Sequence, residues 1–172
     1  MEDLIKSKIR EIPDWPKKGV RFKDITPLIE DKDILKKIID ELALPYLDRK
    51  IDKVVGIDAR GFILAAPLAY RIGAGLAIVR KKGKLPFRTI SKEYALEYGS
   101  NTIEMHEDSI YQGEKVLIID DVLATGGTME ATVELINQLK GEIVGIDFLI
   151  ELISLNGRGK LKGYNIRSLA KY

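Results

Sequence analysis

Two neighbouring carboxylates and a glycine-rich turn stand together in the second half of the chain. Asp120 and Asp121 follow an aliphatic run at 116–119, and the turn that comes next reads Ala124-Thr125-Gly126-Gly127-Thr128. Glycines let backbone N–H groups approach an anion closely, and the N-terminus of a following helix adds positive charge. The pattern predicts a site for a monophosphate, beside carboxylates that suit vicinal sugar hydroxyls and a nearby Mg²⁺ ion.

A helix that simply begins after a strand is the structural alternative for this pattern, with Thr128 as its N-cap. Gly-Gly-Thr alone fits both interpretations equally well. The whole string 116–128 favours ligand binding, because its acids stand at a strand end, where ligands bind in open α/β sheets. A P-loop is excluded, because no Gly-Lys-Ser/Thr sequence follows the glycines.

The elements that must position these residues alternate between strands and helices. Short aliphatic runs predict strands at 53–57, 76–79, 115–119 and 143–150. Apolar stripes and runs predict helices at about 31–42, 61–72 and 129–139. The third strand does not alternate, which is typical of strands buried on both faces of a parallel sheet. We therefore expect a doubly wound α/β fold, with a mainly parallel sheet flanked by helices.

Two other stretches lack long regular elements. Residues 2–11 predict a short amphipathic helix, and the prolines within 12–27 predict a loop or a short hairpin. About 35 residues separate the second strand from the third, and a connection of this length is usually a functional loop or lid. Ile103 and Met105 alternate there with Thr102 and Glu104, so we expect a flexible hairpin.

Composition excludes several classes of site. The chain has 172 residues, no cysteine and one histidine, His106. Disulfides, thiolate zinc sites, iron–sulfur clusters and a cysteine nucleophile are therefore excluded, and so is a histidine-rich metal centre. The length predicts one domain over residues 1–172.

Charge and hydropathy indicate where the protein acts. Lys and Arg number 28 against 26 Asp and Glu, and the net charge of +2 is too small to predict nucleic-acid binding. The acidic start of the chain lacks the apolar segment of an export signal. The longest apolar run, 61–70, is far shorter than the ~20 residues of a membrane span. We expect a soluble, cytoplasmic protein that binds neither nucleic acid nor a membrane.

The string at 116–128 resembles the signature of type I phosphoribosyltransferases, which bind 5-phosphoribosyl 1-pyrophosphate. The resemblance implies that Asp120 and Asp121 hold the ribose hydroxyls and that residues 124–128 hold the 5′-phosphate. It implies the fold of that family, with a small N-terminal hood at about 1–30 and a flexible catalytic loop at about 82–105. The implied cofactor is Mg²⁺, held mainly through substrate and water near the two acids.

Further segments resemble the adenine phosphoribosyltransferases within that family. Residues 56–62 resemble their pyrophosphate loop, which assigns Ala59 and Arg60 to pyrophosphate and makes Arg60 a catalytic candidate. Asp58 stands where the family often has glutamate, an exchange that we expect to be tolerated. Five basic side chains occur within 80–88; a solvated loop is one interpretation, and the resemblance favours pyrophosphate binding by Arg80, Lys81 and Lys84.

Two segments resemble the base-binding parts of these enzymes. For the segment 19–28 the resemblance implies that Phe22 stacks on the purine and that the backbone around Arg21 and Lys23 reads its exocyclic amine. Arg21 departs from the small apolar residue expected there, and a core aromatic is the alternative for Phe22. In the segment 150–158, Leu152 packs on the base.

Residues 94–99, Tyr-Ala-Leu-Glu-Tyr-Gly, resemble the flexible catalytic loop. The resemblance makes Glu97 the candidate that handles the N9 proton of adenine, while Tyr94 or Tyr98 seals the loop over the site. An exposed loop carboxylate is the alternative for Glu97.

Ala124 distinguishes between bases. Phosphoribosyltransferases for 6-oxopurines carry an aspartate at this position, which faces N7 of the base, whereas alanine can neither accept nor donate a proton. The resemblance therefore implies transfer of the phosphoribosyl group to N9 of adenine, giving AMP and pyrophosphate in purine salvage, by a homodimer. A 6-oxopurine or xanthine enzyme is one alternative. A regulator that binds the same ligand is another, although the chain has no spare ~60 residues for a DNA-binding module.

Overall fold

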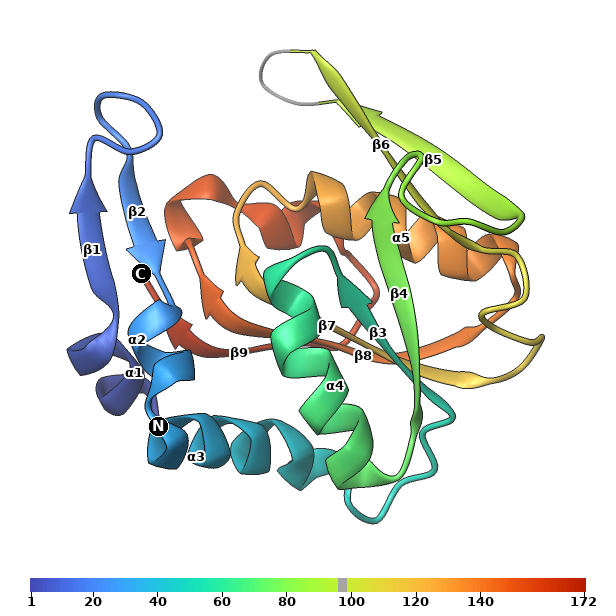
Figure 1. Ribbon diagram of the computed structural model, residues 1–172, viewed down its shortest axis with the longest axis horizontal. Coiled ribbons are helices and arrows are strands. Elements are labelled where there is room, and N and C mark those ends of the chain that lie inside the picture. The colour runs from blue at the N-terminus through green and yellow to red at the C-terminus, as the bar shows by residue number, and fades with distance from the viewer. Residues whose placement is uncertain (96–98) are drawn as a thin grey trace.

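The computed structural model describes residues 1–95 and 99–172. Among them, seven strands form the main sheet, in the order β5-β6-β4-β3-β7-β8-β9 (Figure 1). The strands are β3 (Lys53–Ile57), β4 (Gly75–Lys81), β5 (Thr89–Ala95), β6 (Ser100–His106), β7 (Lys115–Leu123), β8 (Glu142–Glu151) and β9 (Ile166–Lys171). The strands from β4 to β9 in this order pair in parallel, while β6 pairs antiparallel with β4 and β5. The prediction of a mainly parallel sheet is confirmed.

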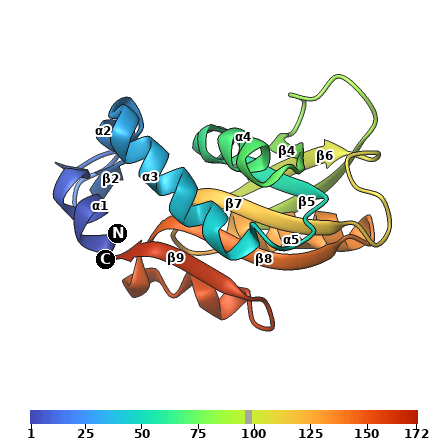
Figure 2. The same ribbon diagram turned by 90° about the horizontal axis from the view of Figure 1, so that it is seen from below.

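Helices cover both faces of this sheet, as Figure 2 shows. One face carries α3 (Lys32–Ala43) and α4 (Arg60–Ile72), and the other carries α5 (Gly127–Gln138). Along β7, Leu117 and Ile119 pack toward α3 and α4, whereas Val116 and Ile118 pack toward α5. All four side chains are fully buried, which explains why the sequence of this strand does not alternate.

The N-terminal segment forms a separate small layer, the hood. It consists of α1 (Glu2–Lys8), a hairpin of β1 (Arg10–Pro13) and β2 (Arg21–Asp24), and α2 (Thr26–Glu30). The short helix and the hairpin expected from the sequence are both present. Ile5, Ile25 and Leu28 are fully buried and join the core beside α3, so this layer is packed onto the sheet domain.

The connection between β4 and β7 is mostly regular. Strands β5 and β6 form the expected hairpin, with antiparallel pairing, and Glu104 on β6 is only 4% exposed. Its carboxylate accepts hydrogen bonds from the backbone N–H groups of Lys84 and Leu85 and from the Thr89 hydroxyl. These bonds replace its lost contact with water. The sequence also failed to predict β9, which is reached through short 3-10 turns at Ile153–Leu155 and Gly157–Lys160.

A buried ion pair fastens β9 to the rest of the domain. Asp147 on β8 is fully buried, and its carboxylate is 2.5 Å from Nη2 of Arg167 on β9. The Tyr46 hydroxyl donates to the same carboxylate at 3.0 Å. Arg167 also donates to the carbonyl oxygens of Glu41 and Leu42, near the end of α3.

No helix in the described part of the chain is long and apolar enough to cross a membrane.

We predict that Arg167→Leu lowers the free energy of unfolding by about 3–5 kcal/mol, because it leaves the buried Asp147 charge without its partner. Urea denaturation measures the change. Arg71→Leu is the control, since Arg71 pairs with Asp40 on the surface at 2.9 Å, and its loss costs at most about 1 kcal/mol. Equal losses in the two variants would contradict the prediction.

Candidate active site

A cavity of about 540 Å³ lies at the carboxyl ends of β3 and β7. The chain turns to opposite faces of the sheet after these two strands, and ligands bind at such a switch point in open α/β sheets. Its walls come from the hood, from the turn between β3 and α4, from the end of β4, from β5 and β6, and from the segment after β8. The lining includes Arg21, Phe22, Lys23, Ala59, Arg60, Arg80, Lys81, Tyr94, Asp120, Asp121, Ala124, Thr128 and Leu152.

A second pocket of about 80 Å³ opens beside the first, at the N-terminus of α5. Residues 122–129 line it together with Asp120 and Phe148, and Asp120, Ala124 and Thr128 line both spaces. Gly126 has φ +79°, a left-handed conformation that favours glycine. The structure thus brings together the whole predicted phosphate loop beside the paired acids.

The two acids differ in their surroundings. Asp121 is 5% exposed, and its Oδ2 lies 2.6 Å from Nε of Arg60 at the start of α4. Asp120 accepts a hydrogen bond from the backbone N–H of Asp121 at 2.9 Å. Burial raises the pKa of Asp121, against the effect of Arg60, and burial together with the Asp121 carboxylate raises the pKa of Asp120. Hydroxyl donors or a cation placed here would stabilise the ionised pair.

The predicted base-binding residues also line the large cavity. Phe22 is half-buried, with the Trp15 ring against it at a centroid distance of 4.4 Å and an angle of 66°. The Arg60 guanidinium carbon lies 5.1 Å from the Phe22 ring centroid. Leu152 follows β8 and donates its backbone N–H to the carbonyl oxygen of Leu123. Phe22 is therefore a cavity wall and not a core aromatic.

Arg21 and Lys23 lie on either side of Phe22 on β2, and both line the cavity. Arg21 forms an ion pair with Glu11 at 3.3 Å, and Lys23 pairs with the same carboxylate. Lys23 also lies 4.3 Å from the centroid of the Tyr172 ring. Because Glu11 pairs with both side chains, the backbone of β2 stays the group that we predict to read the exocyclic amine.

The basic residues near β4 divide into two groups. Arg80 and Lys81 line the cavity, and Arg80 is held by Asp58 at 2.9 Å. Lys84 lines neither space; its N–H donates to Glu104, and its carbonyl oxygen accepts from Nη1 of Arg80 at 3.2 Å. Ala59 lines the cavity and follows a cis peptide bond from Asp58.

Glu97 and Tyr98 lie outside the described residues. Tyr94, just before them, is on the cavity wall, and its phenolic oxygen accepts a hydrogen bond from the Thr128 hydroxyl at 3.1 Å. The strand that leads into the predicted catalytic loop is thereby joined to the phosphate loop.

Sequence reasoning gave no role to Gly157 or to the contact of Asp58 with Arg80. A Cβ at Gly157 would lie 2.3 Å from the carbonyl oxygen of Ala124 and 3.1 Å from the Gly126 nitrogen, so Gly157 packs directly behind the phosphate loop. The glycine in Asn156-Gly157-Arg158 was the available signal, but its partner stands about 30 residues earlier.

The donor set suits a metal ion that arrives with its ligand. Among the described residues, no group of three or more His, Cys, Asp and Glu side chains could hold a metal ion. Asp120 and Asp121 are the carboxylates of the cavity's phosphate side, and Asp121 is already paired with Arg60. Mg²⁺ in proteins is commonly held by one or two carboxylates together with substrate phosphates and water. Asp120 and Asp121 fit that pattern.

Comparison with known proteins agrees with this geometry. Residues 26–162 match the phosphoribosyl transferase domain. The adenine phosphoribosyltransferase of Alkaliphilus metalliredigens is 56% identical over 166 residues, covering 96% of this chain and 98% of the relative. The chain belongs to the adenine phosphoribosyltransferase family.

Solved structures of the family superpose closely on this one. The adenine phosphoribosyltransferase of Thermoanaerobacter pseudethanolicus has a TM-score of 0.95 at 50% identity, with 99% of both chains covered. The Saccharomyces cerevisiae enzyme, in complex with D-2,5-dideoxy-2,5-imino-altritol 1,6-bisphosphate and adenine, has a TM-score of 0.92 at 35% identity, with 97% of both chains covered. The type I phosphoribosyltransferase fold expected from the sequence is confirmed.

We predict that Gly157→Ala weakens binding of ribose 5-phosphate by about tenfold or more, because the new methyl group would displace the phosphate loop. Calorimetric titration measures the dissociation constant. Gly159→Ala is the control, since its Cβ would meet only the Asn156 side chain, at 3.2 Å. Unchanged binding by a folded Gly157→Ala protein would contradict the prediction.

Proposed function

We propose that this protein transfers the 5-phosphoribosyl group of 5-phosphoribosyl 1-pyrophosphate to N9 of adenine, giving AMP and pyrophosphate in purine salvage. The observation that carries the proposal is the order of groups across two neighbouring spaces that share Asp120, Ala124 and Thr128. The phosphate loop, the paired acids and the Phe22–Leu152 wall follow one another across them. This is the order of phosphate, ribose and base in a nucleotide.

The two ends of the donor substrate suit different walls. The loop 124–128 binds the 5′-phosphate through backbone N–H groups and threonine hydroxyls, while Asp120 and Asp121 accept from the ribose hydroxyls. The pyrophosphate meets Ala59, Arg60, Arg80 and Lys81, all of which line the large cavity. Lys84 contributes long-range charge from the neighbouring turn. Asp120 and Asp121 would hold Mg²⁺ together with the substrate, and the ion would supply neutralisation of charge on the pyrophosphate.

In the transfer, N9 of adenine forms a bond to C1′ as the bond from C1′ to the pyrophosphate oxygen breaks, with inversion. Arg60 and the basic side chains stabilise the charge that develops on pyrophosphate. Asp120 and Asp121 hold the electron-poor sugar in place. Glu97 takes the N9 proton, directly or through water, and its exchange for glutamine would lower kcat more than it raises KM for adenine.

We infer a homodimer from the family resemblance. Exposed apolar side chains of Ile63 and Tyr70 on α4 and of Leu76 on β4 support a contact surface there, and light scattering tests it. A cytoplasmic location, without nucleic-acid or membrane partners, is consistent with the composition, and cell fractionation tests it.

We predict that the protein forms AMP from adenine and negligible IMP, GMP or XMP from the other bases, and that Ala124→Asp does not reverse this preference. A backbone carbonyl of β2 accepts from the adenine amine, but it would face O6 of hypoxanthine as a second acceptor. Such a mismatch rejects an analogue by ~10⁴ or more. Competition assays with mixed bases measure the preference. Equal use of hypoxanthine by the wild type would overturn the function, and a switch in Ala124→Asp would overturn only the carbonyl argument.

We predict that Asp120→Asn/Asp121→Asn abolishes AMP formation while the protein stays folded. The change keeps the side-chain volume but removes the two anions that orient ribose and metal ion. Initial rates with circular dichroism as the folding control measure both effects. Near-normal turnover would rule out the paired acids as the ribose site.

A further inference from the structure

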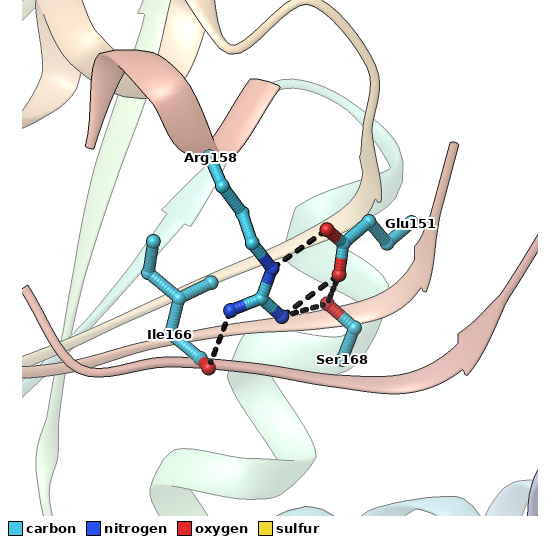
Figure 3. A network of polar contacts seen from close by, with 4 residues as sticks. All are labelled: Glu151, Arg158, Ile166 and Ser168. Carbon is cyan, nitrogen blue, oxygen red and sulfur yellow. Dashed lines mark hydrogen bonds and ion pairs between the residues drawn. The ribbon is translucent and has the colours of Figure 1, made fainter. Parts of the chain in front are cut away.

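A buried ion pair joins the end of β8 to the turn behind the phosphate pocket (Figure 3). Arg158 lies in the turn Gly157–Lys160, and Glu151 is the last residue of β8. The guanidinium reaches both carboxylate oxygens, at 2.6 Å from Nε and 2.8 Å from Nη2. Glu151 is only 6% exposed, whereas the Arg158 side chain is 37% exposed, so the two-pronged contact lies at the edge of the buried region.

Strand β9 fixes the same pair from the other side. Nη1 of Arg158 donates to the carbonyl oxygen of Ile166 at 3.1 Å, and Nη2 lies 3.4 Å from the Ser168 hydroxyl oxygen. The Ser168 hydroxyl donates to Glu151 at 2.8 Å. Figure 3 shows the four residues converging on one point. Arg158 holds the pKa of Glu151 below its usual value, so the carboxylate stays charged at neutral pH.

Each partner adjoins a different wall of the cavity. Arg158 follows Gly157, which packs against the Ala124 carbonyl oxygen and the Gly126 nitrogen behind the phosphate loop. Glu151 precedes Leu152, which lines the base end and is tied to Leu123 by a backbone hydrogen bond. Neither Arg158 nor Glu151 lines the large cavity or the phosphate pocket.

We propose that Arg158 and Glu151 are positioning residues that set the spacing between the bound 5′-phosphate and the bound base. The ion pair presses Gly157 against the phosphate loop and aligns Leu152 with the base wall. This inference rests on the proposed function, because the spacing decides how closely N9 approaches C1′. A displacement of about 1 Å at the reacting atoms can cost ~10²-fold in rate.

Separate ligands distinguish positioning from general stability. Arg158→Ala is expected to raise the dissociation constant of ribose 5-phosphate by about tenfold, because the phosphate loop loses its backing. The dissociation constant of pyrophosphate with Mg²⁺ is expected to stay within roughly twofold, because its predicted ligands lie on β4 and at the start of α4. Millimolar guanidinium chloride is expected to restore part of the ribose 5-phosphate binding and part of kcat.

Arg167→Lys is the matched control. It weakens the other buried ion pair of β9, with Asp147, and is expected to lower the melting temperature without changing ribose 5-phosphate binding. Should Arg158→Ala fail to fold, Arg158→Lys and Ser168→Ala disturb the same network less severely. They are expected to give smaller changes in the same direction.

Unchanged ribose 5-phosphate binding in the Arg158 variants, or equal loss of both ligands, would overturn the inference. Absence of AMP formation by the wild type would instead overturn the proposed function. The two failures are therefore separable, since ligand binding is measured without turnover.

Discussion

The parallel pairing of β3 with β7 is the constraint on which the site depends. Their register runs from Lys53 opposite Val116 to Gly56 opposite Ile119, so both strands end at the same edge of the sheet. From that edge one chain segment enters α4 and the other leads to α5, on opposite faces. Two helix N-termini therefore lie at two neighbouring spaces, and the N-terminus of a helix favours an anion. The ion pair of Arg60 with Asp121 joins the start of α4 directly to the end of β7.

Much of the fold could be predicted from local pattern, and the failures have a common cause. The central strands were recognisable because both of their faces are buried and aliphatic. Strand β9 was not, because Leu169 and Ala170 are its buried residues while Arg167 and Ser168 are polar. Those polar side chains belong to the strand because Asp147 and Glu151, on β8, bind them. Pairing between segments, rather than propensity, creates this strand.

The site divides in the same way. Residues 120–128 are contiguous, so their chemistry is visible in the sequence, and the structure gathers them around the two neighbouring spaces. Gly157 could not be assigned from the sequence, because the Ala124 carbonyl oxygen leaves no room for a side chain there and lies far away along the chain. Lys84 stands close to Arg80 in the sequence and its carbonyl oxygen accepts a hydrogen bond from Arg80, yet Lys84 lines neither space. Glu97 stays a prediction, because it lies outside the described residues.

Trp15 gives the protein an optical property. It is the single tryptophan of the chain, is half-exposed, and packs edge-on against Phe22. Indole emission depends on the polarity and the quenching groups around the ring. A purine that stacks on Phe22 would change the polarity and the quenching groups next to the Trp15 ring, because the two rings are in contact. Ultraviolet fluorescence of the unlabelled protein can therefore follow the arrival of a base at this wall in real time, without a dye or a coupled assay.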